Sequence, residues 1–315
     1  ALTPFALRRL TTPAALAAVW LLFGSAFIAV RVGVTHVPPL LFAGSRLLAA
    51  GAVLLAWSAW RSGWRLGVSR RDVRAAGIVG LGLMAGGQGS VGWAAQYVAP
   101  GVLAVLVTLA PIWIALISLL VLRRPLPGPA VAGMVVAFGG VVVLASPAGG
   151  TGTAPLPALI IVLGSLSWAA ASVYGGLTAI SRRPVLATGI QLVVGGSVQL
   201  VASALLGELG RLHSAAVTGP AGLAWLYLLV GPSLVGFPLF TWLLANTPPA
   251  VANSQAYVSP LVALALGWLL LGTPIGAATL AAAAVILAGV ALMVTMSGRR
   301  PGPAPQLHEE PRAAA

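Results

Sequence analysis

The chain contains no cysteine, no lysine and only four acidic residues, and each shortage excludes a class of chemistry. Without cysteine there is no disulfide, no thiolate nucleophile and no cysteine metal site. Only 7% of the 315 residues are charged, whereas a soluble domain carries about a quarter. With 59% hydrophobic residues and a mean hydropathy of +1.02, the composition predicts a protein whose outer solvent is mostly lipid.

The net charge of +13 comes from seventeen arginines that occur in short runs between long apolar stretches. A nucleic-acid binder instead gathers basic residues on one polar face among hydrophilic segments. Short basic loops follow the positive-inside rule, by which such loops stay on the cytoplasmic side of a membrane. The sequence therefore predicts the lipid bilayer as a partner and no binding of nucleic acid.

A membrane-spanning helix needs about 20 apolar residues to cross a hydrocarbon core of about 30 Å. We expect the first apolar stretch to be a true span, because it is too long for the core of a cleaved signal peptide. Most loops between the apolar stretches are short, so consecutive helices are expected to be antiparallel neighbours. The sequence predicts ten spans, at 13–34, 38–60, 74–97, 101–122, 126–146, 155–179, 184–207, 221–246, 249–271 and 274–297.

Arginine placement orients the predicted bundle, because fourteen of the seventeen arginines fall on one side of it. These fourteen lie in the loops after even-numbered spans and in both tails. Arg46 lies inside a span, and Arg31 and Arg211 fall on the opposite side. The distribution predicts that both termini are cytoplasmic.

The sequence contains an internal repeat in which positions 93–144 match positions 242–293 at a constant offset of 149. Each half holds five predicted spans, and because five is odd, the second half enters the membrane from the opposite side. Such inverted repeats place a substrate near the bilayer midplane, at the interface of the halves. The matched pairs are Trp93 and Trp242, Pro100 and Pro249, Pro111 and Pro260, Pro125 and Pro274, and Gly140 and Gly289.

The repeat divides the chain into five predicted segments. They are an N-terminal cytoplasmic tail at 1–12, a first five-helix repeat at 13–146, a linker at 147–154, a second, inverted repeat at 155–297 and a disordered cytoplasmic tail at 298–315. The linker is part of the flexible, uncharged stretch SPAGGTGTA. An all-α polytopic membrane protein follows from this organisation, and a monomer is compatible with it.

The order of several motifs resembles the EamA-type permeases of the drug/metabolite transporter superfamily. The motifs are WLLFGSAF from Trp20, FAGSRLLAA from Phe42, VLVTLAPIW around Pro111 and SQAYVSPLV around Pro260. The resemblance covers residues 13 to 297. It implies a basket of ten helices around a central cavity in the bacterial inner membrane, with the fifth and tenth helices apart from that cavity. Bacterial exporters of amino acids, including aromatic ones, are closest in character.

Pro111 and Pro260 are expected near the middle of spans four and nine. A mid-helix proline removes one backbone hydrogen bond, and in a membrane protein or cavity water must satisfy the freed carbonyl. Because the two prolines match across the repeat, they are candidate hinges, although a static kink is equally compatible. Pro232 and Pro238 have no counterparts, and we interpret them as static kinks.

The spans contain no acidic residue, since Asp72 falls in a loop and Glu208 at a helix end. Small multidrug antiporters, which resemble this superfamily, depend on a membrane-embedded carboxylate. The chain is therefore expected to move a neutral or zwitterionic solute rather than to exchange organic cations for protons. Histidine is the side chain whose charge can change near neutral pH, but His36 and His213 are expected as solvated residues near helix ends.

Arg46 is the single charge well inside a predicted span, roughly 12 Å from its start. An intramembrane charge is costly, so it indicates a functional residue. One interpretation is a bidentate contact with a substrate carboxylate. The other is a structural role at a broken helix, since the resembling family commonly has an arginine here whatever its substrate.

Polar and aromatic side chains within the spans are the other candidate substrate contacts. Amides beside an aromatic wall suit an amphipathic solute, although serine and glutamine also join helices and tryptophans also pack against them. The candidates are Trp20, Ser25, Gln88, Trp93, Trp113, Trp168, Gln191, Asn253, Gln255, Tyr257 and Ser259.

Other functions find less support in the sequence. The glycines at 87, 89 and 92 match a dinucleotide motif, but no acidic residue follows at the required distance, so we expect helix packing there. A nucleotide sugar needs several cations in the cavity, and only Arg46 is available. An intramembrane enzyme lacks a nucleophile with a base and a metal site, and no cofactor is called for. A channel, a drug-like solute or a non-transporting scaffold stays open.

Overall fold

The computed structural model describes residues 4–63, 67–121, 123, 127–145, 155–177, 184–211, 219–237, 239–240, 243, 255–273 and 275–297. Side chains are described from Thr12 onward. Within these ranges the regular structure is entirely helical. The linker 147–154 and the tail 298–315 lie outside the described residues, as do Pro125, Pro238, Trp242, Pro249 and Pro274.

Each predicted span contains one or more helices. They are α1 (Pro4–Val34), α2 (Pro39–Arg61), α3 (Arg70–Gly80), η1 (Leu81–Gln88), α4 (Gly89–Ala94), α5 (Pro100–Val107), α6 (Ala110–Leu120), α7 (Gly128–Ala145), α8 (Pro155–Leu177), α9 (Pro184–Leu205), α10 (Pro220–Leu228), η6 (Leu229–Gly236), α13 (Gln255–Leu271) and α14 (Ala277–Ser297), with a short 3₁₀ turn, η4 (Glu208–Arg211), after α9. α1 begins at Pro4, inside the segment expected as a tail.

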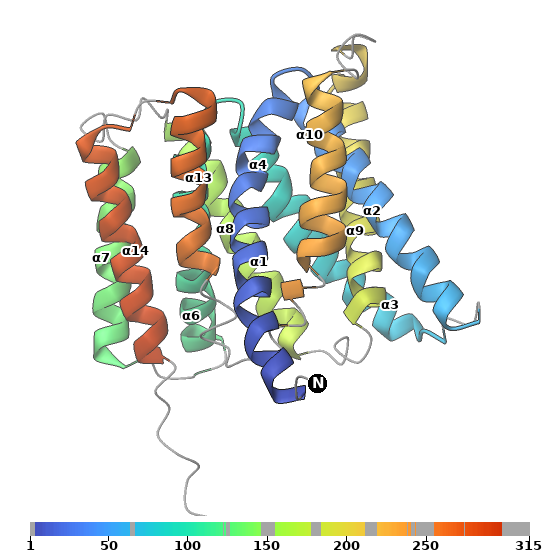
Figure 1. The fold of residues 1–315 in the computed structure, drawn as a ribbon, viewed down its shortest axis with the longest axis horizontal. Helices are drawn as coiled ribbons and strands as arrows, with labels where there is room; N and C mark the ends of the chain where they lie inside the picture. The colour runs from blue at the N-terminus through green and yellow to red at the C-terminus, as the bar shows by residue number, and fades with distance from the viewer. Residues whose placement is uncertain are drawn as a thin grey trace, which may run out of the picture.

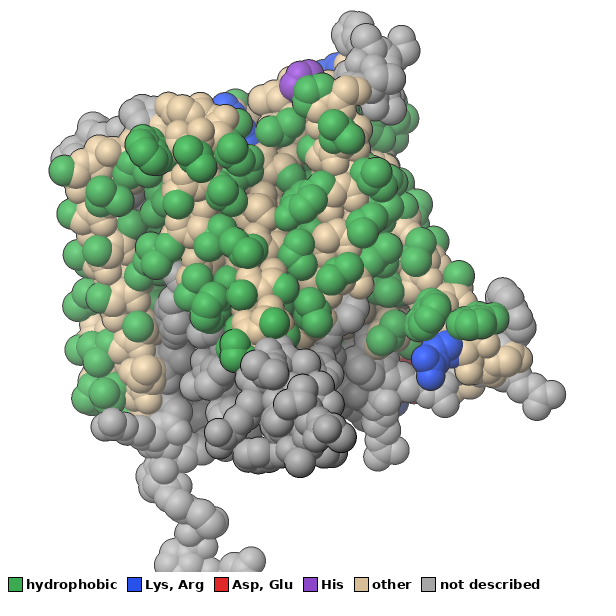
Figure 2. All heavy atoms as spheres, viewed as in Figure 1, with side chains coloured by type: hydrophobic (Ala, Val, Ile, Leu, Met, Phe, Trp, Pro, Cys, Tyr) green, Lys and Arg blue, Asp and Glu red, His purple; other side chains and the backbone are tan. Residues whose placement is uncertain are grey.

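The helices stand side by side as a bundle, with α7 and α14 together at one end and α2, α3 and α9 at the other (Figure 1). Hydrophobic side chains cover the face drawn in Figure 2, and cationic side chains appear near its edges. Five of the described helices are long and apolar enough to cross a membrane, and four shorter helices are also apolar. The protein is therefore an all-α membrane protein.

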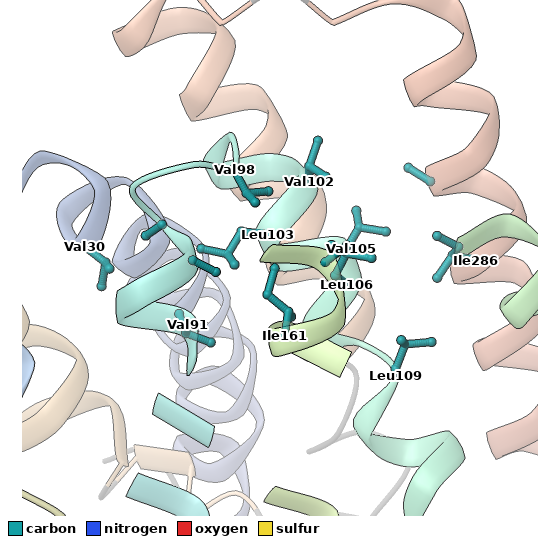
Figure 3. Close-up of a cluster of buried hydrophobic side chains, with 14 of the residues drawn as sticks. Val30, Val91, Val98, Val102, Leu103, Val105, Leu106, Leu109, Ile161 and Ile286 are labelled. Carbon is teal, nitrogen blue, oxygen red and sulfur yellow. The ribbon is translucent and has the colours of Figure 1, made fainter. Parts of the chain in front are cut away.

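α5 occupies the centre of the largest hydrophobic cluster. Its first residue is proline, which suits a helix start because the missing N–H has no partner there. Every residue from Pro100 to Leu106 is buried. In Figure 3, Leu103 and Leu106 lie between Val91 on one side and Ile286 of α14 on the other, with Ile161 beside them. α5 thus joins the helices around it through close apolar contacts.

The two candidate hinge prolines lie in different local structures. Pro111 directly follows a break, because α5 ends at Val107 and α6 begins at Ala110. The Thr108 hydroxyl donates to the Val105 carbonyl at 2.6 Å across the turn. Pro260 instead lies inside the continuous helix α13. The bend expected at the first proline is therefore an interruption of the helix, whereas the described helix runs through the second.

Two glycines join α7 to α14, and they are counterparts in the 149-residue offset. A Cβ on Gly140 would lie 2.7 Å from Ile286 Cγ1 and 3.2 Å from the Ala282 carbonyl. A Cβ on Gly289 would lie 2.6 Å from both Ala137 N and the Gly133 carbonyl. Ala282 and Ile286 follow Gly133 and Ala137 by the same 149 positions. Gly140 and Gly289 therefore make the same contact from opposite sides, each with the matching residues of the other half. The two helices run antiparallel.

A second glycine pair joins α2 to α9. A Cβ on Gly196 would lie 2.6 Å from Leu48 N and 2.8 Å from the Gly44 carbonyl. A Cβ on Gly44 would lie 3.0 Å from Leu200 N and from the Gly196 carbonyl. Gly196 and Leu200 each follow Gly44 and Leu48 by 152 positions. Here too, each helix contributes the matching residues of its half to the contact. Small residues permit this close approach of two membrane helices.

Two helices of the bundle contain a π-helical segment of eight residues. η1 continues α3 and leads into α4, and η6 continues α10. η6 begins and ends 148 positions after η1. π-helices account for well under about 1% of residues and appear frequently at functional sites. The two π-helical segments have equal length, and their offset of 148 is close to the repeat offset of 149. The residues that contact them are therefore candidates for a functional role.

Candidate functional site

Arg46 lies on the α2 face that turns away from lipid, and it is 5% exposed. Its NH1 donates to the Ser233 hydroxyl of η6 at 3.0 Å. Its Nε has no hydrogen-bond partner in the structure. Arg46 therefore connects α2 with a π-helical segment 187 residues away along the chain, and in this state the side chain is enclosed by protein.

Ser233 extends this bond to the backbone at the start of η6. Pro232 has no N–H to donate to the Leu228 carbonyl, four residues before it, as an α-helix would require. Ser233 lies five residues after Leu228, the spacing of a π-helix, and its hydroxyl donates to the Leu228 carbonyl at 2.9 Å. Arg46, Ser233 and Leu228 thus form one chain of hydrogen bonds.

η1 receives a bond of the same kind from α9. Gln199 is 2% exposed, and its Nε2 donates to the Met84 carbonyl at 2.6 Å. Its Oε1 has no partner in the structure. Met84 and Pro232 are both the fourth residue of their π-helical segments. We call the Arg46–Ser233 and Gln199–Met84 contacts the π-segment bonds.

The two π-helical segments also meet in one small hydrophobic cluster. Met84 of η1 and Leu47 of α2 are each 1% exposed, and Leu192 of α9 is fully buried. Leu229 and Leu234 of η6 pack against them. The four helical stretches that carry the π-segment bonds therefore share one core.

Helix packing accounts for the glycines of η1, as the sequence indicated. A Cβ on Gly87 would lie 2.8 Å from the Trp168 ring, and one on Gly86 would lie 2.9 Å from Ser167 Cβ. The Ser167 hydroxyl donates to the Gly82 carbonyl at 3.0 Å. η1 therefore lies directly against α8, and Trp168 is held over the glycine face of the π-helical segment.

The four predicted tryptophans, Trp20, Trp93, Trp113 and Trp168, are all half-buried. Trp113 Nε1 donates to the Ser165 hydroxyl at 3.0 Å, and its ring meets Phe138 edge to face with centroids 5.4 Å apart. The ring of Trp93 lies 4.9 Å from that of Tyr97. Trp93 and Trp113 pack against the same hydrophobic cluster.

The predicted polar residues are distributed over five helical stretches. The Ser25 hydroxyl of α1 contacts the Tyr227 hydroxyl of α10. Ser259 of α13 is buried, and its hydroxyl has no partner in the structure. Asn253 and the side chain of Tyr257 lie outside the described residues. Half-buried positions are occupied by Trp20, Gln88, Gln191 and Gln255.

Two charged side chains close helix ends rather than enter the core. Glu208 accepts a hydrogen bond from Leu41 N at 2.9 Å, at the first turn of α2, where an anion is favoured. Arg31 donates to the Ala95 carbonyl at the end of α4. His36 is exposed and contacts the Thr35 hydroxyl at 2.9 Å, as expected for a residue near a helix end. His213 lies outside the described residues.

Sequence reasoning missed the π-segment bonds. Gln199 is one of two amides in α9, which was the available signal, but its acceptor is a backbone carbonyl, and the sequence does not indicate which carbonyl a side chain will bind. Ser233 follows Pro232 directly, and a hydroxyl beside a membrane proline is the second signal. Of the predicted residues, only Arg46 takes part in these bonds.

Comparison with known proteins identifies the class of molecule. The EamA-like transporter family matches residues 12–146 and again residues 155–295. An uncharacterised inner membrane transporter of Escherichia coli, YedA, is 36% identical over 272 residues, covering 84% of this chain and 83% of its own. A probable terminal-alkyne amino-acid exporter of Streptantibioticus cattleyicolor is 29% identical over 291 residues, covering 88% and 93%.

The fold is also found among solved structures. One crystal structure is similar with a TM-score of 0.61 at 22% identity, over 92% of this chain and 99% of its own. At this identity the likeness concerns the fold alone, and the family matches concern function. The chain therefore belongs to the EamA-like transporter family, and it is a membrane transporter rather than an enzyme.

Proposed function

We propose that the protein exports small neutral or zwitterionic metabolites, with amino acids, including aromatic ones, as the first candidates. Transport proceeds by alternating access between two inverted five-helix repeats, 13–146 and 155–297, that form a ten-helix basket around a central cavity. The protein lies in the inner membrane with both termini in the cytoplasm, and it needs no cofactor.

The proposal is carried by the two glycine contacts, α7 with α14 and α2 with α9, in which matching residues of the two halves meet. A pseudo-two-fold axis in the membrane plane requires each helix to run antiparallel to its counterpart and each contact to recur with the halves exchanged. The α7/α14 and α2/α9 contacts both have this form. The separate family matches to 12–146 and 155–295 support the same division.

The solute class follows from the scarcity of charge within the bundle. The four acidic residues of the chain are Asp72, Glu208, Glu309 and Glu310, so the spans offer no carboxylate to hold a cation or a coupling proton. Amides and indoles remain, which bind a zwitterion by hydrogen bonds and an apolar side chain by contact. Similarity to the Streptantibioticus exporter supports amino acids.

Aromatic, amide and hydroxyl side chains of the predicted spans form the proposed substrate contacts. Pro111 and Pro260 are the proposed hinges of spans four and nine. Arg46 is enclosed by protein in this state, and we assign it a separate role below. The proposed contacts are Trp20, Ser25, Gln88, Trp93, Trp113, Trp168, Gln191, Asn253, Gln255, Tyr257 and Ser259.

Counterflow in proteoliposomes tests the proposal. Vesicles preloaded with one unlabelled amino acid receive labelled threonine, methionine, phenylalanine or tryptophan without an ion gradient. Saturable uptake that depends on the preloaded solute is expected, with none for a nucleotide sugar. Gln88→Leu is expected to raise the half-saturating concentration, while Leu81→Ala, at an exposed position of the same segment, is not. Absence of exchange by inserted protein for every amino acid contradicts the amino-acid assignment.

A further inference from the structure

The π-helical segments lie beside α2 and α9, which we call the frame. The two frame helices are in close backbone contact at Gly44 and Gly196. η6 contacts the frame through side chains, whereas Gly80, directly before η1, also approaches the α9 backbone, since a Cβ there would lie 2.6 Å from the Gln191 carbonyl. The π-segment bonds, donated by Gln199 of α9 and Arg46 of α2, connect the frame to the two segments, and η1 is also bonded to α8 by Ser167.

Each π-segment bond crosses between the halves of the chain. Arg46 belongs to the first half and binds a segment of the second, whereas Gln199 belongs to the second half and binds a segment of the first. The acceptor in η1 is the fourth of its eight residues, Met84, and the acceptor in η6 is the fifth, Ser233. The two contacts are therefore a matched pair with different chemistry, a charged donor on one side and a neutral amide on the other.

Each donor also keeps one buried atom unused. Four described side-chain atoms are buried without a partner, and Arg46 Nε and Gln199 Oε1 are two of them. An unpaired polar group in a membrane interior is costly, and this cost favours a second arrangement in which the atom is bonded. Each donor therefore has one further atom available for a bond in a second arrangement of its segment.

We propose that η1 and η6 are the paired moving elements of the transport cycle, with Gln199 and Arg46 as the positioning residues that hold them. This inference rests on the alternating access proposed above. Both bonds are present in the state described here. Release of the Arg46–Ser233 bond frees η6 and opens one side of the membrane, and release of the Gln199–Met84 bond frees η1 and opens the other. Pro232 is then part of a moving segment rather than a static kink.

Because each bond is released in a different state, removal of one donor shifts the equilibrium toward the state that does not use it. Arg46→Leu is expected to free η6 and leave η1 in place, and Gln199→Leu to do the reverse. The expected change is about three- to ten-fold in the ratio of the two populations, the effect of one lost hydrogen bond. A merely structural residue would loosen both segments together.

Electron spin resonance on two pairs of labels separates these outcomes. The chain has no cysteine, so introduced cysteines carry the only labels. Leu205→Cys with Leu223→Cys reports the helix of η6 against the frame, and Val53→Cys with Val73→Cys reports the helix of η1. All four positions are exposed, and Leu205 follows Val53 by the frame's offset of 152. Reconstituted full-length protein is used without solute, so the result does not depend on which solute is transported.

The proposal expects a crossed pattern. Arg46→Leu changes the distances of the Leu205/Leu223 pair alone, and Gln199→Leu changes those of the Val53/Val73 pair alone. Val198→Ala, the exposed neighbour of Gln199, changes neither. If Arg46→Leu protein does not insert, Ser233→Ala removes the same bond at its acceptor. Distances that change together, or that stay unchanged in folded variants, overturn the proposal. Absence of counterflow in protein that shows the crossed pattern counts instead against the solute assignment.

Discussion

The pairs α2/α9 and α7/α14 use the same backbone contact for different purposes. In both, glycine lets two antiparallel helices touch, and the contact exchanges counterparts of the chain. The α2/α9 pair also carries Arg46 and Gln199, which reach out to other helices. The α7/α14 contact consists of glycine, alanine and isoleucine. The comparison indicates that one pair is a frame for polar contacts, whereas the other is an apolar support at the end of the bundle.

The largest expected effect is at the frame. Gly196→Leu places a side chain where a Cβ already lies 2.6 Å from Leu48 N and 2.8 Å from the Gly44 carbonyl. Backbone atoms cannot turn aside, so the helices must separate and the π-segment bonds lose their geometry. We expect loss of folded protein, measured as the monodisperse fraction in detergent by size-exclusion chromatography.

A matched control for this substitution lies on α7. Gly139 has open space around the position of a Cβ, so Gly139→Leu adds the same side chain without a collision. It is expected to yield folded protein. If the Gly196→Leu protein is as monodisperse and as stable as the Gly139→Leu protein, α2/α9 is not a rigid frame, and the distinction between the two pairs fails.

A smaller effect is expected at the apolar support. Gly289→Leu collides with backbone as closely as Gly196→Leu does, since a Cβ at 289 would lie 2.6 Å from Ala137 N and from the Gly133 carbonyl, so α7 and α14 must separate. The effect is expected to be smaller because this pair lies at the end of the bundle and can separate without displacing the other helices. The support carries no π-segment bond, so the protein is expected to melt at a lower temperature in detergent while counterflow persists below that temperature. Loss of counterflow in Gly289→Leu protein that is still folded would show that α7 and α14 take part in transport.

The sequence predicted an all-helical membrane protein, because long apolar runs mark such helices directly. The repeat offset of 149, visible in Gly140 and Gly289, reappears in the α7/α14 contact. A disturbance of the helix at Pro111 was also expected, because a proline removes a backbone hydrogen bond, and the structure has a break there between α5 and α6. Apolar length and proline chemistry are local properties, and local properties can be read from the sequence.

The candidate site was predicted less completely, because its bonds are not local. In a helix that is apolar on all sides, hydrophobic periodicity does not distinguish an α-helical register from a π-helical one, so η1 and η6 left no pattern. Gln199 and Ser233 are single polar residues far from their partners in the sequence. Arg46 was identified because an intramembrane charge is conspicuous, but its acceptor depends on how the helices pack.

The smallest expected effect lies at the edge of the frame, where Glu208 ties α2 to the chain just after α9. Its carboxylate accepts from Leu41 N at 2.9 Å at the start of α2. Glu208→Ala is expected to lower the free energy of unfolding by about 1 kcal/mol, the usual value of a helix cap. Glu208→Gln keeps an acceptor and loses only the interaction of charge with the helix dipole, so it is expected to cost less.

The melting temperatures of Glu208→Ala and Glu208→Gln are compared with that of Ser69→Ala, which removes the cap of a helix outside the frame. Ser69 accepts from Asp72 N at 3.1 Å and caps only its own helix, α3. If Glu208 acts as a third tie within the frame, Glu208→Ala lowers the melting temperature and also broadens the distances of the Leu205/Leu223 labels, whereas Ser69→Ala lowers the melting temperature alone. Equal behaviour of the two variants would mean that Glu208 is an ordinary cap, and that the frame depends on its glycines.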